Sequence, residues 1–317
     1  MKAVRCHNHE ICVHEVPEPA GLGVRVRVAS AGICGSDLHM LQQGFPIPFT
    51  LGHEIAGVTD NGIPVAIEPS VYCGHCERCV RGDYNLCVRG TETIMGVGRD
   101  GGMTEHLVVP EHCLVPLPGG IRAEDACLVE PLSVAVRGIA KAGITDKHKV
   151  AIIGGGSIGL CAVAVARQAT EWVHLFARHP AQLRAGEILG ATLGDASTDT
   201  SENYDLVIDC AGTDAALEQA ANLCRHGGTV LMLATYWEGL TFPAMQMTMK
   251  ELRTVTSMAQ GRQGLVRDVD IAAATLAKNP LIAPTLITHR LPLEAAAEAF
   301  DIAADRKQGA IKVAFNP

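Results

Sequence analysis

Apolar and polar residues alternate along the first 30 positions, most clearly in VRVRVAS at 24–30, and the alternation stops at PEPAGLG. A period of two predicts β-strands with one buried face, and the Pro and Gly residues predict the turn between them. Short strands are also expected in EIAGVT at 54–59, in IPVAIEP at 63–69 and within 102–118. This part of the chain is therefore predicted to be rich in strands and turns.

The pattern changes after residue 118. Residues 124–143 have the repeating apolar face of a helix, and apolar strands follow at VAII, WVHLF, YDLVID, GGTVLMLATY and LRTVTSMA, separated by helical segments. Strands that alternate with helices predict a parallel sheet with helices on both faces, an α/β architecture. The last residues, 291–317, predict a helix and a final strand. We place the domain boundaries near residues 127 and 263, so that 1–126 and 263–317 form one domain and 127–262 the other.

Length and composition fit a two-domain globular protein. The chain has 317 residues, 48% hydrophobic and 19% charged, which is enough for two cores. A formal charge of −8 argues against nucleic acid or an anionic membrane as partner. No apolar run approaches the ~20 residues of a membrane span, and the N-terminus lacks the apolar region of a signal peptide. Twelve clustered cysteines then indicate reduced thiols and metal binding in the cytoplasm.

Four cysteines lie close together in a lobe at residues 71–90. Cys73, Cys76, Cys79 and Cys87 have the spacing C-x2-C-x2-C-x7-C. Four thiolates at such spacings can close a tetrahedron around zinc and stabilise a lobe that has almost no apolar core of its own. A nucleic-acid zinc ribbon is the other functional interpretation, but it usually pairs two C-x2-C knuckles across a longer gap, and the net charge opposes it. A structural zinc site is the favoured interpretation.

A second group of possible metal ligands lies in GICGSDLHMLQQGFPIPFTLGHE at 32–54. Cys34, His53 and Glu54 offer sulfur, nitrogen and oxygen, and a mixed donor set is typical of zinc sites that keep a position open for substrate. The glycines beside Cys34 allow a tight bend, and SDLHMLQ predicts a short helix with Ser36 or Asp37 as its N-cap and His39 on the same side as Ser36. A buried thiol with histidines on turns is the alternative.

A glycine-rich turn predicts a nucleotide site. Gly154, Gly156 and Gly159 form G-x-G-x-x-G, with Ser157 and Ile158 inside it, directly after the strand VAII and at the start of a helix. The first glycine permits a tight turn, the second lets a pyrophosphate approach the backbone, and the third allows close helix packing. The helix N-terminus then favours the phosphate charge. The position within a strand–turn–helix sequence predicts dinucleotide binding.

The end of the next strand bears on which dinucleotide binds. NAD-binding proteins usually place Asp or Glu there for the ribose hydroxyls, whereas this chain has Ala177 followed by Arg178 and His179. Arginine offers a planar fork of donors that suits a 2′-phosphate. We therefore expect NADP(H) in preference to NAD(H), the alternative being that Arg178 is a solvated charge and both cofactors bind.

These motifs together resemble the zinc-dependent medium-chain dehydrogenases, the alcohol, sorbitol and threonine dehydrogenase superfamily. The resemblance covers essentially the whole chain and rests on G-I-C-G-S-D-x-H at 32–39, G-H-E at 52–54, the four cysteines, G-x-G-x-x-G and I-K-V at 311–313. It implies a GroES-like β-rich catalytic domain made from both chain ends, with a Rossmann domain between them. It also implies two zinc ions per chain and a homo-oligomer, either dimer or tetramer.

The resemblance makes Cys34, His53 and Glu54 the expected ligands of a catalytic zinc. The family's second cysteine is replaced by Glu130, as in the sorbitol, threonine and glucose dehydrogenase branches. We expect one carboxylate to bind directly and the other to exchange with water or substrate, and the sequence leaves open which of Glu54 and Glu130 is direct. The alternative for Glu130 is a carboxylate favoured by a helix N-terminus.

The expected reaction is hydride transfer between a small alcohol or carbonyl substrate and NADP(H). Zinc lowers the pKa of a bound hydroxyl, and the nicotinamide takes the hydride. By resemblance, Ser36 takes the proton and passes it through the cofactor ribose to His39, whose ordinary pKa is near neutrality. The carboxylate-ligated branch implies polyols, sugars or amino alcohols. The alternatives are an NADPH-dependent aldehyde, ketone or quinone reductase and a non-catalytic nucleotide-binding member of the fold.

Overall fold

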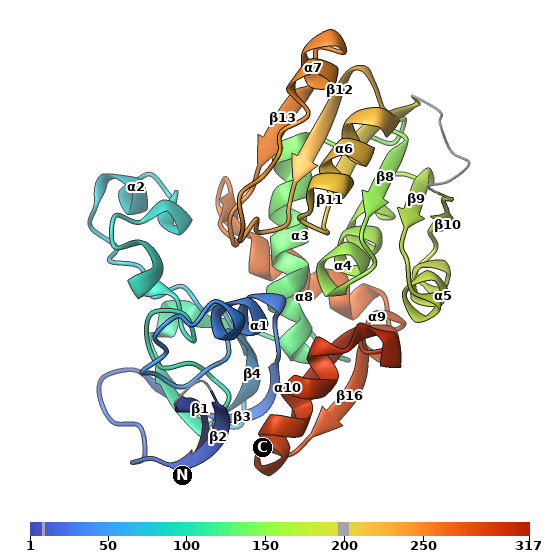
Figure 1. Cartoon of the computed structure of the whole chain (residues 1–317). Helices are drawn as coiled ribbons and strands as arrows, with labels where there is room; N and C mark the ends of the chain where they lie inside the picture. The colour runs from blue at the N-terminus through green and yellow to red at the C-terminus, as the bar shows by residue number, and fades with distance from the viewer. Residues whose placement is uncertain (8–9, 196–202) are drawn as a thin grey trace. The chain divides into compact units, whose positions relative to one another are not determined.

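The computed structural model describes residues 1–7, 10–195 and 203–317. The chain forms two compact units, Met1–Glu130 with Gln260–Pro317, and Pro131–Ala259 (Figure 1). Both chain ends therefore contribute to the first unit. All twelve cysteines are free thiols.

The first unit is built on a seven-stranded, mostly antiparallel sheet. Its strands have the order β16-β17-β3-β4-β5-β7, and β6 pairs with β3. The sheet strands are β3 (Val24–Gly32), β4 (Glu54–Thr59), β5 (Pro64–Ile67), β6 (His106–Val109), β7 (Leu114–Pro116), β16 (Ile287–Leu291) and β17 (Lys312–Phe315). Strand β17 from the chain end pairs with β3, and in this register Ala314 lies opposite Gly32. This pairing brings the chain end beside the strand that precedes Cys34.

Two small hairpins and several helices complete the first unit. The hairpins are β1 (Lys2–His7) with β2 (Glu10–Glu15), and β14 (Arg262–Gln263) with β15 (Val266–Arg267). The α-helices are α1 (Gly35–Gln42), α2 (Glu77–Val80), α8 (Asp268–Lys278), α9 (Ile282–Leu286) and α10 (Ala296–Ala304). Short 3₁₀ helices are η1 (Tyr84–Leu86), η2 (Gly90–Thr93), η3 (Glu111–Cys113), η4 (Ala126–Leu128), η5 (Leu293–Ala295) and η6 (Arg306–Gln308).

The second unit contains a six-stranded parallel sheet in the order β10-β9-β8-β11-β12-β13. Its strands are β8 (Val150–Ile153), β9 (Val173–Phe176), β10 (Thr192–Leu193), β11 (Tyr204–Asp209), β12 (Cys224–Met232) and β13 (Arg253–Thr256). The helices are α4 (Ser157–Ala166), α5 (Pro180–Ile188), α6 (Asp214–Leu223) and α7 (Ala244–Met249), and α3 (Val129–Ala142) leads into the unit. Numbered along the chain, the strand order is 3-2-1-4-5-6, the doubly wound order of dinucleotide-binding folds.

The parallel sheet confirms the predicted α/β architecture and follows from the residue types of its strands. Strand β8 is buried at all four positions, as expected for a central strand covered on both faces. Its Cα partners are on β9 on one side and β11 on the other. The two-residue strand β10 was absent from the prediction, because Thr192 and Leu193 are both exposed and too few to produce an apolar pattern.

Candidate functional site

Cys34, His53 and Glu54 come together in the first unit. Cys34 directly precedes α1, and His53 and Glu54 lie at the start of β4. Strand β4 pairs antiparallel with β3, so that Glu54 lies opposite Gly32, two residues before Cys34. One ligand atom from each of the three side chains lies within 4.8 Å of the others. The sheet register thus brings together residues that are separated by twenty positions in the sequence.

Helix α1 begins differently from the prediction. Its N-cap is Cys34, whereas the sequence predicted Ser36 or Asp37. Asp37 lies at the third helical position, and its Oδ2 accepts a hydrogen bond of 2.9 Å from the Cys34 backbone N–H. The polar-residue rule for N-caps failed because a carboxylate inside the first turn holds the backbone of the preceding cysteine.

Asp37 also faces His53. Its Oδ1 lies 3.6 Å from His53 Nδ1, and both side chains are buried. Burial raises the pKa of Asp37, and the charge of His53 only partly offsets this effect. Burial lowers the pKa of His53, but the negative charges of Asp37 and Cys34 outweigh it and hold that pKa well above 6.5. A carboxylate behind one imidazole nitrogen orients the ring and leaves the other nitrogen for a ligand.

Glu54 forms a buried ion pair with Lys312 from the chain end. Lys312 Nζ lies 2.6 Å from each carboxylate oxygen, donates to Oε1 and also donates to the Ile33 carbonyl. The two side chains are only 1% and 2% exposed. Burial lowers the pKa of Lys312, but the charges of Glu54 and Cys34 reverse this effect and raise it strongly. The sequence contained Lys312 only as part of I-K-V, and no local signal connected it with Glu54.

Gly32 provides the space for the Glu54 carboxylate. A Cβ atom at this position would lie 2.1 Å from Glu54 Oε2. That oxygen is buried, and Lys312 Nζ, 2.6 Å away, is the cation that compensates its charge. A buried carboxylate is costly unless a cation or a donor faces it. Sulfur, nitrogen and this oxygen form a donor set that zinc accepts, so the residues fit the metal.

Glu130 lies near this cluster but outside the group of three. It is buried at the start of α3. Burial raises its pKa to about 7, even though the charge of His53 lowers it. Its oxygens are not within 4.8 Å of all three ligand atoms, judged over the described chain. Of the two candidate carboxylates, Glu54 is therefore the one that shares a centre with Cys34 and His53.

Ser36 and His39 both belong to α1, as predicted. Ser36 Oγ lies 3.3 Å from His53 Nε2, so the hydroxyl is directed at the cluster. His39, three residues later, is exposed. A half-buried hydroxyl beside the imidazole and an exposed imidazole one turn away have the placement that a proton path to solvent needs.

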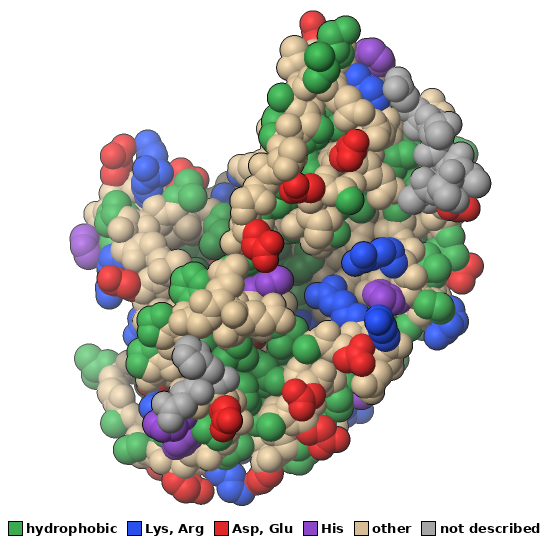
Figure 2. Space-filling view, in the orientation of Figure 1, with side chains coloured by type: hydrophobic (Ala, Val, Ile, Leu, Met, Phe, Trp, Pro, Cys, Tyr) green, Lys and Arg blue, Asp and Glu red, His purple; other side chains and the backbone are tan. Residues whose placement is uncertain are grey.

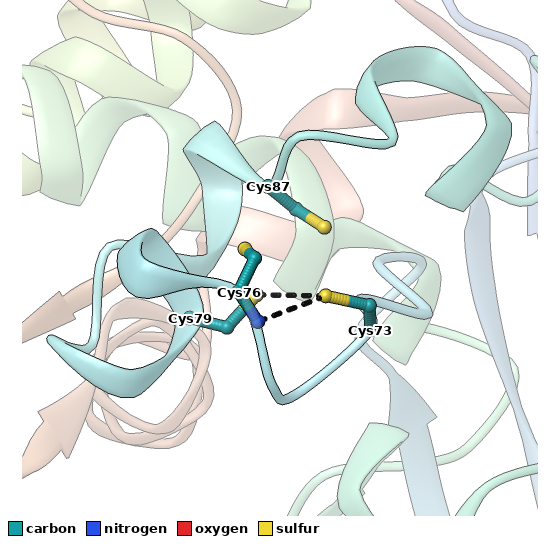
Figure 3. A group of neighbouring side chains, drawn as sticks. All are labelled: Cys73, Cys76, Cys79 and Cys87. Carbon is teal, nitrogen blue, oxygen red and sulfur yellow. Dashed lines mark hydrogen bonds between the residues drawn. The ribbon is translucent and has the colours of Figure 1, made fainter.

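The four cysteines of the lobe also converge. One sulfur atom from each of Cys73, Cys76, Cys79 and Cys87 lies within 4.8 Å of the others, and Figure 3 shows the side chains directed toward one another. Cys73 Sγ is 3.9 Å from Cys79 Sγ and accepts a hydrogen bond of 3.4 Å from the Cys76 N–H. Backbone N–H groups lower the pKa of Cys76 to about 6, whereas burial raises that of Cys79 to about 12. Four adjacent thiols cannot all ionise without a cation, which zinc supplies.

A buried polar network connects this lobe to the rest of the first unit. Tyr84, between Cys79 and Cys87, has its hydroxyl oxygen 2.5 Å from Glu68 Oε1 and 2.8 Å from the Gly261 carbonyl. Arg267 Nη1 lies 3.4 Å from Glu68 Oε2. Burial raises the pKa of Glu68 to about 7 even though Tyr84 and Arg267 lower it. Glu68 is thus bonded to a residue of the lobe and to Arg267 of the first unit.

The glycine-rich turn occupies the switch point of the parallel sheet. Gly154 follows β8 with a φ of +101°, a conformation that L side chains rarely adopt. Gly156 is the N-cap of α4, and a Cβ at Gly159 would lie 1.8 Å from the Gly154 carbonyl oxygen. Gly154 and Gly159 therefore have a steric reason to be glycine. The turn lies between β8 and β11, where strand order reverses and dinucleotides bind in such sheets.

Arg178 and His179 follow β9 on the neighbouring side of this turn. Arg178 is exposed, and His179 is the N-cap of α5. A Cβ at Gly155 would lie 2.8 Å from the Cβ of Ala177, so the glycine turn and the end of β9 are adjacent. An exposed guanidinium at the end of the second strand is placed to receive a phosphate on the ribose.

The protein combines the lobe of four cysteines, a cluster of sulfur, nitrogen and oxygen donors in a β-rich unit, and a doubly wound nucleotide-binding fold. Together these features define a zinc-containing nicotinamide-dependent dehydrogenase. The family model for the alcohol dehydrogenase GroES-like domain matches residues 21–119, and the model for a zinc-binding dehydrogenase matches residues 157–274. L-galactonate-5-dehydrogenase of Escherichia coli K12 is 31% identical over 314 residues, which cover 90% of this chain and 89% of the relative. The chain belongs to the zinc-dependent medium-chain dehydrogenase superfamily and is an oxidoreductase.

Solved structures agree with this assignment. A zinc-binding dehydrogenase of Sinorhizobium meliloti 1021, bound to NADP, is 30% identical with a TM-score of 0.88 and covers 100% of this chain and 99% of its own. Galactitol-1-phosphate dehydrogenase of Escherichia coli is 27% identical with a TM-score of 0.90 and covers 100% of both chains. The GroES-like and Rossmann architectures expected from the sequence are confirmed. In the described ranges, no helix has the length and apolarity needed to cross a bilayer.

Proposed function

We propose that this protein transfers hydride between a secondary alcohol of a polyol or sugar-type substrate and NADP(H). The observation that carries the proposal is the cluster of half-buried Cys34 with buried His53 and Glu54, in which Glu54 is paired to Lys312. The names of two similar proteins support the substrate class, because one acts on L-galactonate and the other on galactitol 1-phosphate. Both substrates carry rows of secondary hydroxyl groups.

Cys34, His53 and Glu54 would hold a catalytic zinc, and Glu130 would exchange with water or substrate. The charges favour this division. Two ligand charges of −1 balance Zn²⁺, and the +1 of Lys312 offsets the −1 of Asp37, so the centre stays close to neutral. A further charged carboxylate ligand would make the centre negative and weaken its Lewis acidity, but burial raises the pKa of Glu130 and favours its neutral form.

The residues of this chain would bind, orient and exchange a proton around the reacting hydroxyl. When bound, zinc would lower the pKa of that hydroxyl, and the nicotinamide would accept a hydride from the carbon that bears it. Asp37 orients His53, and Lys312 fixes Glu54. Ser36 accepts the hydroxyl proton, and His39 releases it to solvent from the exposed side of α1. The same groups supply the proton when a carbonyl is reduced.

The cofactor would bind to the second unit. Gly154, Gly156 and Gly159, with Ser157 and Ile158, would receive the pyrophosphate, and Arg178 with His179 would bind the 2′-phosphate of NADP. One similar dehydrogenase has bound NADP and another has bound NADH, so this preference rests on Arg178 and His179. The first unit is then the catalytic domain and the second unit the dinucleotide-binding domain.

The four cysteines would bind a second, structural zinc, giving two per chain. Free thiols throughout the protein are consistent with a reducing compartment, which we propose to be the cytoplasm. We also propose a homo-oligomer, dimer or tetramer, acting on a small molecule and not on nucleic acid or membranes.

The test is a kinetic panel with the zinc-loaded protein. Polyols, sugar acids and short secondary alcohols are compared with NADP and with NAD. We expect kcat/KM to be highest for a polyol or sugar derivative and at least about tenfold higher with NADP, since a hydrogen bond to a charged group contributes about 1.5–3 kcal/mol. A preference for NAD contradicts the cofactor assignment. Reduction of simple aldehydes without polyol oxidation favours the reductase alternative.

Two arginine variants sharpen the cofactor test. Arg178→Ala should raise KM for NADP about tenfold or more and leave KM for NAD nearly unchanged, because only NADP carries the 2′-phosphate. Arg184→Ala is the matched control, since Arg184 is an exposed arginine on α5. Equal effects of the two substitutions would show that Arg178 contributes general surface charge only.

A further inference from the structure

A further group of histidine and cysteine side chains lies on the β1–β2 hairpin, apart from the two clusters described above. The antiparallel register places Arg5 opposite Cys12, His7 opposite Glu10 and Ala3 opposite His14. Directly opposed residues and their i±2 neighbours share one face of a β-ribbon. His7, Cys12 and His14 are therefore on the same face, whereas Cys6 is on the opposite face.

Two side chains of this face are in contact and a third lies nearby, although the three ligand atoms are not all within 4.8 Å of one another as they are in the two clusters above. Cys12 Sγ lies 3.1 Å from His14 Nε2, and the ring centroids of His7 and His14 are 6.1 Å apart with the planes tilted by 57°. Bond lengths of about 2.3 Å to sulfur and about 2.0–2.1 Å to nitrogen separate two tetrahedral zinc ligands by roughly 3.3–3.7 Å. Cys12 and His14 need little movement, and His7, which is exposed, reaches the centre by turning its side chain.

The local charges do not oppose a cation. Arg5 shares the face, but its Nη2 is directed to Asp100 Oδ1 at 3.2 Å, which partly neutralises the guanidinium. Glu10 adds a negative charge beside His7 on the same face. Figure 2 shows histidine side chains at the surface over the β1–β2 hairpin, so an ion from solvent can reach them. One thiol and two imidazoles form a donor set that zinc prefers over hard cations such as magnesium.

We propose that His7, Cys12 and His14 form a solvent-accessible binding site for Zn²⁺ on the β1–β2 hairpin. Binding deprotonates the Cys12 thiol and releases that proton to solvent, and the imidazoles bind in their neutral form. Water occupies the remaining position. The site differs from the other two clusters because both of its histidines, His7 and His14, are exposed, and its zinc should exchange more readily.

Alkylation of Cys12 in the presence of Zn²⁺ alone tests the proposal. The full-length protein, already loaded with zinc, is treated with iodoacetamide with and without added micromolar Zn²⁺, and each cysteine is followed by peptide mass spectrometry. We expect added zinc to slow the alkylation of Cys12 about tenfold or more, because the bound thiolate is no longer free to react. Cys6, on the opposite face of the same hairpin, is the internal control and should not change.

His14→Ala and His7→Ala provide the second measurement. Each variant should lose the protection of Cys12, and equilibrium dialysis should show one zinc fewer per chain than in the wild type. The dialysis compares zinc per chain in each variant with zinc per chain in the wild type, so the number of ions at the other clusters does not affect the result. Thermal melting checks that the variants fold. Equal alkylation of Cys12 with and without zinc, or unchanged protection in both variants, would overturn the proposal.

Discussion

The two sulfur-containing clusters of the first unit differ in almost everything except the cation they are suited to bind. The four cysteines of the lobe offer only sulfur, and three of the four are half-buried. The Cys34–His53–Glu54 cluster mixes three donor types, and its His53 and Glu54 are buried. A closed set of four thiolates leaves zinc no further ligand position, whereas three mixed ligands leave one for a substrate oxygen.

The residues around the two clusters also differ, in how firmly they orient the side chains of each cluster. Asp37 and Lys312, both buried, contact His53 and Glu54 and fix their orientation. In the lobe, fewer buried side chains contact the cysteines, and short local elements such as the helix α2 arrange the sulfur atoms. A centre that reacts needs oriented ligands and a controlled charge, whereas a centre that stabilises needs only closure. Substitutions in each cluster should therefore have different consequences.

His53→Ala should have the largest effect on activity. Removing a ligand from the mixed cluster should lower kcat/KM by about 1,000-fold, which corresponds to about 4 kcal/mol of transition-state stabilisation. The melting temperature should change far less than in lobe variants. Steady-state kinetics and zinc analysis on the same preparation measure both effects. His226→Ala, at an exposed position of the second unit, is the control and should retain full activity.

Cys87→Ser should have the opposite effect, lowering stability while leaving turnover nearly unchanged. The lobe variant should lose one zinc per chain and melt roughly 5–10 °C lower, as expected for a loss of about 3 kcal/mol in a domain of this size. Its kcat per folded molecule should remain within about twofold of wild type. Thermal melting with and without a chelator measures this. If Cys87→Ser abolished turnover in fully folded protein, the contrast between the two clusters would be wrong.

The convergence of residues in both clusters was easier to predict from the sequence than the residues that surround them. Cys73, Cys76, Cys79 and Cys87 lie within fifteen residues, so local spacing alone indicates their convergence. Cys34 and His53 were candidates because of their chemistry and a family resemblance, and pairing of β3 with β4 brings them together. Lys312 could not be connected with Glu54, because that contact depends on β17 returning from the chain end to β3.

The nucleotide fold shows the same division between local and long-range information. The glycine-rich turn and the strands on either side of it were predictable, because each is a short segment with its own apolar or steric pattern. The edge strand β10 was not, since its two residues are exposed and pair only through β9. The structure therefore adds what long-range pairing decides, namely the grouping of Glu54 with Cys34 and His53 and the contact between His53 and Asp37.

Gly32→Ala should sharpen the comparison by disturbing the orientation of one ligand without removing it. The new Cβ would lie 2.1 Å from Glu54 Oε2, so the carboxylate must move away from its position beside Lys312. We expect zinc affinity and kcat/KM to fall about tenfold to 100-fold, the range found when the support of a metal ligand is lost. Gly119→Ala is the control, because its Cβ would meet nothing within 4 Å. Equal activity in both variants would show that the position of Glu54 is not critical.

Glu68→Gln should have the smallest effect, and it tests how the lobe is held. The Tyr84 hydroxyl has one proton and two close acceptors, Glu68 and the Gly261 carbonyl, so a protonated Glu68 completes the chain of hydrogen bonds. Its pKa of about 7 in the folded protein lies above its ordinary value of 4.5. The folded state therefore binds the extra proton, and the stability that Glu68 contributes is complete below pH 4.5 and is lost as the pH rises through 7.

Glutamine keeps both hydrogen bonds at every pH, since its amide donates to Tyr84 as the protonated acid does. The melting temperature of Glu68→Gln, relative to wild type, should therefore rise between pH 5 and pH 8, by an amount equivalent to about 1–3 kcal/mol. Differential scanning calorimetry at both pH values measures the change. Glu111→Gln, at an exposed position, should show no such trend. A pH-independent difference for Glu68→Gln would mean that Glu68 is already ionised below pH 5, and that its ion pair with Arg267, and not a shared proton, holds the lobe.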